Sequence, residues 1–418
     1  MDQAQCNTLW SFLEKVPDPR AARGQRYTWM GLLTLVLYGL ASGQKTVWAI
    51  ACWVQQHIVE IQGQLALTLP RAPSAATFYR ALRRMPIEEL EQQMGAYGRS
   101  VEGPREPEGE EEVEPRRSAR AVDGKELRGT LAQGELVHLV SMVEHDSGAT
   151  VGQCRVPQEA GELAVMPQLL SEESVQGQVI TFDALFWSLL STIPSCGEEQ
   201  RPNAQRSVAQ RVMDLGGDYL VKVKGNQPRV LGALQGLFST PPAPGEERWE
   251  CTTYDKGHGR WERRHVVASE DLQGRLEWPG VEQAICRTCE RVQLKSGIRS
   301  LKVRYALTSL SHEQASVEEL AALWRGHWSI ENRSHYVRDE TLAEDRGQTH
   351  KGHASQALAA LRNGLLTALR EHGWKSIPDA LRAHVAPTIT PLLLIGAPTR
   401  SQQIPSAKMQ DSSTFPGL

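Results

Sequence analysis

The sequence predicts an α/β protein preceded by a separate helical domain, and three observations support this prediction. Residues 1–100 show the spacing of buried helices, and residues 101–118 are rich in glutamate and proline. From residue 119 onward, short strand-like runs alternate with helical stretches, which is typical of an α/β core. At 418 residues the chain is long enough for two or three domains with a large buried core.

The first 100 residues are expected to form a helical domain. Thr28 is placed to cap a helix with an apolar buried side, and Ser74 is placed to cap a second helix that ends near residue 85. The outer face of the second helix carries three arginines: Arg80, Arg83 and Arg84. A helix with an arginine face is compatible with DNA binding, and the alternative is an ordinary solvated surface.

Residues 101–118 form an acidic segment that we interpret as a flexible linker. Seven glutamates against three arginines leave this segment at −4, and it holds three prolines and no aromatic residue. Because the whole chain is at −3, the remainder is at +1. The net charge therefore neither indicates nor excludes a nucleic-acid partner, and local basic patches decide the question.

The pattern after the linker divides the chain further. Residues 119–245 carry the first strands and helices of the α/β core. Residues 246–310 have a mainly β pattern, and we expect this insertion to lie off the core sheet. Residues 311–396 are expected to supply the helical remainder of the core, and residues 397–418 a disordered tail.

Cysteine usage and hydropathy favour a cytoplasmic protein without a membrane segment. The 7 cysteines are scattered and odd in number, which does not suit a disulfide framework. The most apolar run, residues 29–41, is shorter than the roughly 20 residues that span a bilayer. Cys286 and Cys289 form a single CxxC without a second pair, so no zinc site is expected.

Ionisable side chains concentrate in residues 324–345, WRGHWSIENRSHYVRDETLAED. As a helix, this stretch would place Glu331, His335 and Asp339 on one face, since residues four apart are neighbours. One carboxylate cannot hold a divalent cation alone. Two upstream aspartates lie in or after strand-like runs, namely Asp123 in SARAVDGKELRG and Asp183 in GQVITFDALFW.

Two strand aspartates and a helix glutamate match the way a ribonuclease-H-like fold builds a site for two magnesium ions. Mg²⁺ prefers oxygen ligands, and a pair of such ions can activate a water or 3′-OH for in-line displacement. Taken alone, Asp123 in a DG dipeptide is more simply a turn residue. The hypothesis therefore depends on the set of three rather than on any one of them.

Over nearly its whole length, the chain resembles the insertion-sequence DDE transposases of the H-repeat-associated type. The similar segments follow one another in order: VPDPRAARGQRYTWMGLLTLVLYGLASG with AIACWV, AVDGKELRG, VITFDAL, GGDYLVKVKGNQ, HGRWERR and RGHWSIENRSHYVRDETLAED. The resemblance implies a ribonuclease-H-like catalytic core with a mainly β insertion between the second aspartate and the glutamate. It also implies DNA cleavage and strand transfer with two Mg²⁺ (or Mn²⁺) ions.

The resemblance assigns roles to individual residues. Asp123, Asp183 and Glu331 match the catalytic, metal-binding triad. His327 and Arg338 stand at the basic positions around the last acid, which makes them candidate DNA contacts. Two further candidates are Lys125 and Lys224, and a role at a turn surface is the alternative for Lys125. His335 and Asp339 are candidates for supporting Glu331.

The implied partners are the DNA of the element ends and of the target, and a second copy of the chain in a homodimer that pairs two ends. The implied location is the bacterial cytoplasm, on the nucleoid when bound to DNA. Two alternatives stay open: a transposase-derived DNA-binding protein that no longer cuts, and a two-metal nuclease without strand transfer.

Overall fold

The computed structural model describes residues 7–23, 25–101, 117–133, 136–158, 160–183, 203–272, 276–347, 349 and 351–400. Most of the expected acidic linker, and the expected tail beyond residue 400, lie outside these ranges. The chain divides into two compact units. Unit 1 comprises Met1–Val101, Gly129–Glu135 and Val337–Leu418, and unit 2 comprises Glu102–Arg128 and Leu136–Tyr336.

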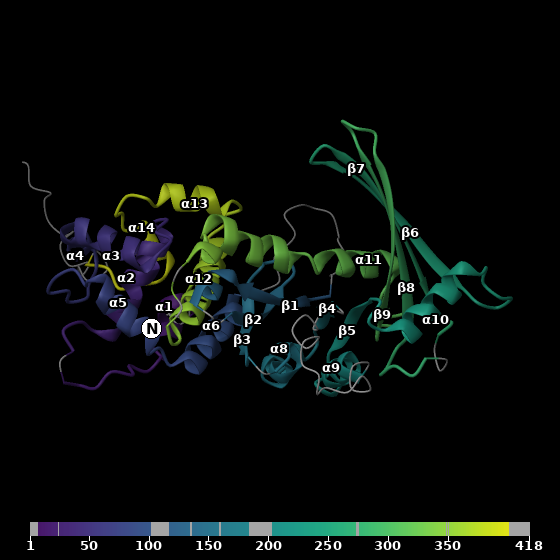
Figure 1. Ribbon diagram of the computed structural model, residues 1–418, viewed down its shortest axis with the longest axis horizontal. Helices are drawn as coiled ribbons and strands as arrows, with labels where there is room; N and C mark the ends of the chain where they lie inside the picture. Colours follow the sequence, from purple (N-terminus) through teal and green to yellow (C-terminus); the bar gives the residue numbers. More distant parts are fainter. Residues whose placement is uncertain are drawn as a thin grey trace, which may run out of the picture. The chain divides into compact units, whose positions relative to one another are not determined.

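Unit 1 is built from helices (Figure 1). They are α1 (Leu9–Leu13), α2 (Trp29–Ala41), α3 (Val47–Gln56), α4 (Ile58–Gln64), α5 (Ala75–Arg83), α6 (Ile87–Val101), η2 (Arg128–Gln133), η7 (Val337–Thr341), η8 (Glu344–Arg346), α12 (Ala354–Glu371), α13 (Ile377–Ala383) and α14 (Thr390–Leu394). Thr28 caps α2 as predicted, because its hydroxyl accepts a hydrogen bond from the backbone N–H of Gly31 (3.1 Å). Within the described ranges, no helix is long and apolar enough to cross a membrane.

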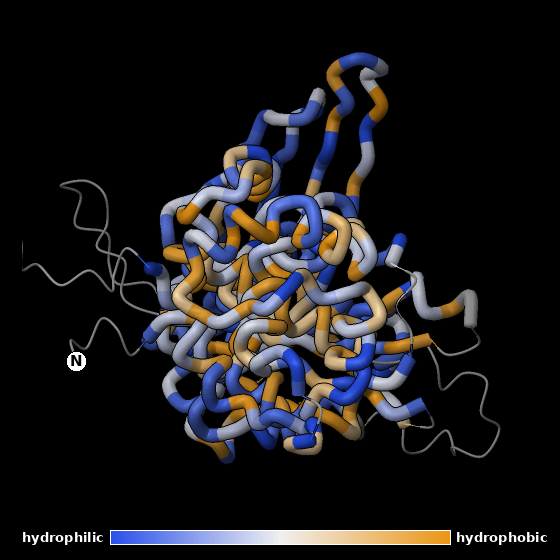
Figure 2. The backbone as a smooth tube through the Cα atoms, turned by 90° about the vertical axis from the view of Figure 1, so that its left-hand side faces the viewer, coloured by the Kyte–Doolittle hydropathy of each residue, from blue (hydrophilic) through white to orange (hydrophobic). Residues whose placement is uncertain are grey.

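The centre of unit 1 is α12, whose residues 354–369 are all buried. Its apolar side chains share one core with those of α1, α2, α3, α5 and α6. Gly364 permits a close approach, since a Cβ there would lie 2.7 Å from Sδ of Met94 and 3.0 Å from Cδ1 of Leu9. Figure 2 shows hydrophobic residues gathered toward the centre of this packing, with hydrophilic residues on the outer turns.

The position of α12 differs from the expectation that residues 311–396 complete the catalytic core. From Val337 onward the chain packs with the N-terminal helices of unit 1. A helix that is buried on every side must be enclosed by other helices, and the N-terminal helices provide those surfaces. The helical pattern alone did not reveal which neighbours would enclose it.

Within the described residues, unit 2 is built on one nine-stranded sheet with the order β3-β2-β1-β4-β5-β9-β8-β7-β6 (Figure 1). The strands are β1 (Ala119–Leu127), β2 (Val137–Glu144), β3 (Thr150–Val156), β4 (Val179–Phe182), β5 (Asp218–Val223), β6 (Arg248–Gly257), β7 (Arg260–Ser269), β8 (Gln283–Gln293) and β9 (Arg299–Thr308). β4 runs parallel to both β1 and β5, and all other pairings are antiparallel. This mixed sheet confirms the predicted α/β class with preceding helices.

The prediction that residues 246–310 lie off the core sheet is wrong. These residues do form strands, β6 to β9, but β9 pairs antiparallel with β5, with Lys222 opposite Ala306. The insertion therefore extends the core sheet. The physical reason is that β5 would otherwise end the sheet with an unpaired row of backbone N–H and C=O groups, which β9 satisfies.

The two faces of this sheet are covered by different helices. On one face, α9 (Asn203–Asp214) packs with neighbouring segments over apolar side chains that include Val122 and Val221. On the other face, α11 (Val317–Gly326) packs over Leu220, Ala306 and their neighbours. We refer to these as the α9 face and the α11 face. The remaining helices that the structure describes in unit 2 are η3 (Glu162–Val165), α7 (Met166–Leu169), α8 (Glu172–Val175), α10 (Pro228–Ser239) and η6 (Ile330–His335).

Candidate active site

Asp123 lies on β1, and Asp183 directly follows the parallel neighbouring strand β4. In the register of β1 and β4, Val122 is opposite Phe182, and each aspartate is the next residue along the chain. Side chains alternate between the faces of a sheet, so Asp123 is on the α11 face, opposite to Val122. Strand pairing thus explains how two aspartates distant in sequence come together.

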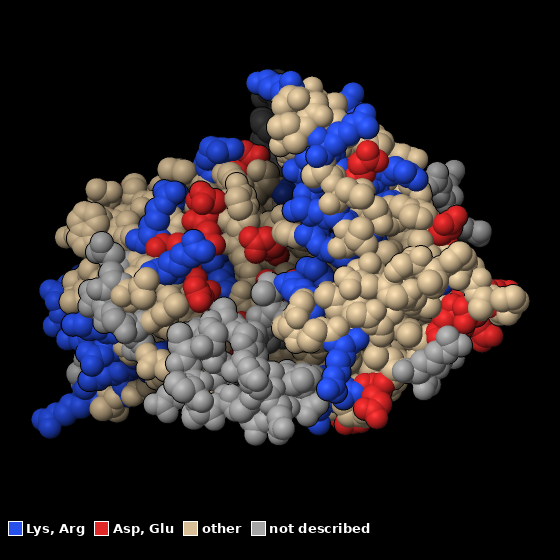
Figure 3. Space-filling view, turned by 45° about the vertical axis from the view of Figure 1, so that its right-hand side comes forward, with Lys and Arg blue, Asp and Glu red and all other residues tan. Residues whose placement is uncertain are grey.

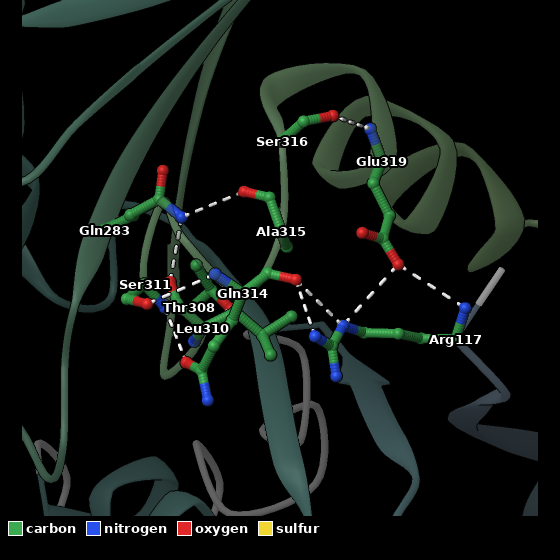
Figure 4. A network of polar contacts seen from close by, with 9 residues as sticks. All are labelled: Arg117, Gln283, Thr308, Leu310, Ser311, Gln314, Ala315, Ser316 and Glu319. Carbon is green, nitrogen blue, oxygen red and sulfur yellow. Dashed lines mark hydrogen bonds and ion pairs between the residues drawn. The ribbon is translucent and has the colours of Figure 1, made fainter. Parts of the chain in front are cut away.

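The loop before α11 is fixed to the sheet by hydrogen bonds (Figure 4). Gln283 on β8 donates its side-chain N–H to the carbonyl oxygens of Leu310 (2.9 Å) and Ala315 (3.4 Å). The hydroxyl of Ser316 caps α11 by accepting a hydrogen bond from the backbone N–H of Glu319 (3.3 Å). These contacts set where α11 begins, and therefore the course of the segment that follows it.

That segment, η6, brings Glu331 to the α11 face. It is a π-helical stretch, a wide form of helix that is frequent at functional sites. Ile330 is buried in a small cluster with Ala121 and Val143, which anchors η6 against β1 and β2. Ala121 precedes Asp123 by two residues on the same face, so the neighbouring Glu331 lies beside that aspartate.

The side chains of Asp123, Glu331 and His335 converge. Nδ1 of His335 lies 3.4 Å from Oε2 of Glu331 and 3.9 Å from Oδ2 of Asp123. One potential ligand atom from each side chain lies within 4.8 Å of the other two. Two carboxylates and an imidazole nitrogen are ligands that divalent cations accept, so the donor set fits a metal site.

Asp183 is held by two lysines. Its Oδ2 lies 2.9 Å from Nζ of Lys222 and 3.0 Å from Nζ of Lys224. Burial alone would raise the pKa of Asp183, but the two ammonium groups hold it below its ordinary value. Within the described residues, Asp183 is not part of the convergent donor set. The structure therefore brings two members of the predicted triad together and places the third against cations.

Burial raises the pKa of Asp123 to about 7. A hydrogen bond from the N–H of Gly124 opposes this rise, while the negative charges of Glu162, Asp183 and Glu331 add to it. A carboxylate that keeps its proton near neutral pH in a cluster of acids indicates a site prepared for a cation. The negative charges of the two other predicted acids, Asp183 and Glu331, therefore both act on Asp123.

Gly124 leaves room for a buried pair behind Asp123. On the α9 face, Nε2 of His138 lies 2.6 Å from Oε1 of Glu162. A Cβ on Gly124 would overlap that carboxylate oxygen and would lie 2.6 Å from the same imidazole nitrogen. The glycine thus allows the side chains of His138 and Glu162 to pack directly against the strand that carries Asp123.

We expect Gly124→Ala to destabilise unit 2 by about 1–3 kcal/mol, because the methyl group forces the buried pair or β1 to move. Urea denaturation measures the loss of unfolding free energy. Gly257→Ala on β6 is the matched control, since nothing lies within 4 Å of its added Cβ. An alanine at residue 124 that is tolerated as well as the one at residue 257 would contradict this account.

His327 was predicted to contact DNA, and the structure shows it hydrogen-bonded to the sheet. Its Nδ1 lies 3.0 Å from Oγ1 of Thr181, which in turn lies 3.0 Å from Nε2 of His145. Burial lowers the pKa of His327 to about 4 and that of His145 to about 3. As a neutral imidazole, His327 holds β4 through Thr181, and its contact with DNA stays a prediction.

Lys125 and Lys224 both lie within the acidic site. Lys125 is buried on β1, so the alternative of a surface turn is wrong. The pKa of Glu331 is held below its ordinary value, first by a hydrogen bond from His335 and also by the charge of Lys125. Lys224 pairs with Asp183. Contact of these lysines with DNA stays a prediction.

The structure contradicts the prediction that Arg338 contacts a phosphate. Arg338 is fully buried in unit 1, with Nε 2.8 Å and Nη2 2.6 Å from Oε2 of Glu344. Nη1 of Arg362 lies 3.1 Å from the other oxygen of this glutamate. By contrast, Arg80 and Arg83 of α5 and the adjacent Arg84 are exposed, and their contact with DNA stays a prediction.

Sequence reasoning missed several residues of the site, among them Lys222, Thr181, His145, His138 and Glu162. A signal existed for Lys222, because Lys222 and Lys224 alternate along DYLVKVKGNQ and therefore share one face of a strand. Linking that face to Asp183 requires knowing that β4 and β5 are neighbours, which no local pattern gives. The other residues carried no local signal.

Comparison with known families shows which class of protein the chain is similar to. Residues 10–97 match the family described as “DDE_Tnp_1-associated”. This match lies in the N-terminal helices of unit 1. Together with the relatives described next, it confirms the resemblance that the sequence motifs indicated: the chain is similar to transposases of the H-repeat-associated type.

Two relatives from Escherichia coli illustrate the similarity. The chain is 26% identical over 260 residues to “Putative transposase YncI” of strain O157:H7, which covers 60% of this chain and 61% of that protein. It is 27% identical over 256 residues to “H repeat-associated putative transposase YhhI” of strain K12, which covers 58% and 61%. The chain thus matches about three-fifths of the length of these relatives.

Proposed function

We propose that this chain is a DDE transposase that cleaves DNA at the ends of an insertion sequence and joins the 3′-OH to target DNA. The observation that carries this proposal is the convergence of Asp123 and Glu331 beside Asp183. Similarity to transposases of the H-repeat-associated type supports the choice of DNA as substrate.

We further propose that β3-β2-β1-β4-β5 is a ribonuclease-H-like core. Its central strand β1 carries Asp123, its parallel neighbour β4 leads into Asp183, and a helical segment over the same face supplies Glu331. Each acid comes from a separate element, so the fold itself assembles the site. The remaining strands extend this core rather than forming a second sheet.

The donors that would hold a divalent cation, Mg²⁺ or Mn²⁺, are Asp123, Glu331 and His335. When bound, such a cation supplies activation of a water or 3′-OH and stabilises the leaving oxygen. A second cation, as the resemblance implies, would draw on Asp183 and would require it to release a lysine. The ammonium groups of Lys222 and Lys224 are placed to bind and orient a phosphate beside these acids.

The proposal is tested by incubating the purified chain and Mg²⁺ with labelled DNA that carries the sequences flanking its own gene. We expect strand cleavage followed by a joined product on a separate target DNA. Nicked DNA without any joined product would instead identify a nuclease. Binding without cleavage would identify a DNA-binding protein, and either result would overturn the proposal.

The raised pKa of Asp123 predicts how the stability of the metal-free protein depends on pH. The ordinary pKa is 3.8, and the folded value is about 7. Because the pKa of Asp123 is higher in the folded state, ionisation of this carboxyl opposes folding. The resulting loss of unfolding free energy is absent below pH 3.8, grows between pH 3.8 and about 7, and is complete above about pH 7. We expect Asp123→Asn to be more stable than the wild type at about pH 8.

Urea denaturation in the presence of a chelator, repeated across this pH range, measures the difference in unfolding free energy. The difference should shrink toward zero as the pH falls below 3.8 to about 3, where aspartate is mostly protonated in both states. A difference that does not change with pH would show that Asp123 has an ordinary pKa.

The proposed reaction also defines partners. Pairing two DNA ends would bring two copies of the chain together, so we expect a homodimer on DNA. Cross-linking with and without DNA measures this. The proposed location is the cytoplasm, on the nucleoid when DNA is bound.

A further inference from the structure

Four arginines gather on the α11 face where β7, β8 and β9 extend away from the core. The strand register brings them together: Arg287 is opposite Arg304, Arg264 is opposite Cys289, and Arg291 follows two residues later on β8. Directly opposite side chains are about 5 Å apart and diagonal ones about 7–8 Å. Like charges at these separations destabilise a sheet, so the cluster needs a physical explanation.

Arg287 is the most confined member. It is 8% exposed, and its guanidinium carbon lies 4.3 Å from the ring centroid of Trp324 on α11. Burial, together with the charges of Arg304, Arg264 and Arg291, lowers the pKa of Arg287 to about 10. In the described part of the chain, no carboxylate forms an ion pair with Arg287. A buried charge without a counter-charge is costly.

The carboxylates near the cluster lie on its outer side. Glu262 on β7 pairs with Arg291 (2.9 Å) and with Arg264. Asp255 on β6 pairs with Arg264 (3.5 Å) and with Arg325 (2.8 Å). Neutralisation is therefore concentrated toward β6 and β7. The β8–β9 side of the cluster, nearest to β5, keeps an excess of positive charge.

This excess continues to the candidate active site. Lys222 on β5 is opposite Ala306 on β9, and Arg304 lies two residues from Ala306 on the same face, so the two cations are diagonal neighbours. Lys222 also contacts Asp183. A row of cations thus crosses neighbouring strands from the acidic site to Arg287. Figure 3 shows lysine and arginine side chains gathered over this part of unit 2.

We propose that the arginines at positions 264, 287, 291 and 304 bind backbone phosphates of DNA that extends from the acidic site across β5, β9, β8 and β7. Guanidinium groups bind phosphate oxygens in pairs and tolerate burial better than ammonium groups do. Strands about 4.8 Å apart present several such groups in a row, which suits a polymer of phosphates better than one small anion. The identity of the anion as substrate DNA rests on the proposed function.

The test compares two variants in a background that does not cut, Asp123→Asn. Arg304→Gln removes a half-buried cation of the cluster, whereas Arg263→Gln removes an exposed arginine of β7 on the opposite face. The probe is a fluorescein-labelled DNA duplex of random sequence, and anisotropy gives its affinity at several salt concentrations. We expect Arg304→Gln to weaken binding by about 5- to 10-fold at 0.1 M salt and to reduce the salt slope by about one.

Thermal unfolding of the same proteins separates lost binding from lost folding. Removing one of several like charges should leave the melting temperature of Arg304→Gln unchanged or raised. Inorganic phosphate should stabilise the Arg263→Gln protein more than the Arg304→Gln protein.

The outcomes for this proposal and for the proposed function can be told apart. DNA binding that is as strong in Arg304→Gln as in Arg263→Gln overturns the arginine cluster as a DNA contact, even where the wild type cuts and joins DNA. Loss of binding in Arg304→Gln alone supports the cluster, even where the wild type proves unable to cut. A wild-type protein that binds no DNA at all overturns both the arginine cluster as a DNA contact and the proposed transposase function.

Discussion

Replacing Asp123 by asparagine is expected to slow DNA cleavage by about 10³-fold or more without unfolding the protein. Asparagine has the same shape as aspartate but lacks its charge, so the convergent donor set loses one of two anionic ligands. A bound divalent cation contributes several kcal/mol to such a reaction, and each 1.4 kcal/mol corresponds to about tenfold in rate. Single-turnover cleavage of labelled DNA measures the effect.

Asp214→Asn is the matched control for this variant. Asp214 is exposed on α9, where its Oδ1 accepts a hydrogen bond from Gln210 (2.8 Å), and it lies on an element of the α9 face. Its replacement should leave the cleavage rate unchanged. Titration with Mn²⁺, followed by electron paramagnetic resonance, should show weaker binding for Asp123→Asn only. Cleavage at the wild-type rate by Asp123→Asn would show that this carboxylate takes no part in the reaction.

The strand that contains Asp123 could be predicted, because strand-like runs identify β1 and β4. The expectation that Asp123 and Asp183 meet came from the ribonuclease-H-like set of acids, since no local pattern shows that the two strands are parallel neighbours. Helical spacing likewise relates Glu331 to His335, and the structure places these two side chains 3.4 Å apart. What the spacing does not give is the order of strands. The contacts of Lys222 with Asp183 arise across two strands that are remote in sequence.

The sheet extension shows the same limit on a larger scale. The β pattern of residues 246–310 is local, and the structure contains the corresponding strands. The choice between a separate sheet and an extended one depends on whether β5 has a free edge. That property belongs to the assembled sheet, where β9 pairs with β5. A pattern read along one strand therefore predicts the strand but not its partner.

Arg338 illustrates a different failure. Its match to a basic position of the family motif around Glu331 suggested that both serve one site. The segment is π-helical and passes from unit 2 to unit 1 between Tyr336 and Val337. Two residues beyond that boundary, Arg338 is enclosed by unit 1 and paired with Glu344. A boundary between compact units leaves no mark in the spacing of charged residues.

The second large effect is expected at this buried pair. Glu344→Gln should destabilise unit 1 by about 3–5 kcal/mol, because it removes the carboxylate that pairs with two buried guanidinium groups. Oxygens of Glu344 lie 2.6 Å from Arg338 and 3.1 Å from Arg362, and all three side chains are buried. Urea denaturation measures the loss. Glu340→Gln is the control, since its exposed carboxylate lies 3.8 Å from exposed Arg346 and should contribute less than about 1 kcal/mol.

A further variant separates two causes of this loss of unfolding free energy: a buried charge left without its partner, and the loss of a net stabilising ion pair. If the loss comes from uncompensated charge, replacing all three residues by apolar ones of similar size, as Arg338→Met, Glu344→Leu and Arg362→Met together, should restore most of the unfolding free energy. A triple variant that stays as unstable as Glu344→Gln would show that the hydrogen-bonded geometry, including the bond from Arg362 to the carbonyl of Lys45 (3.1 Å), stabilises unit 1 directly. Full recovery would instead leave the ion pairs as a means of fixing one packing of η7 and η8 against α12.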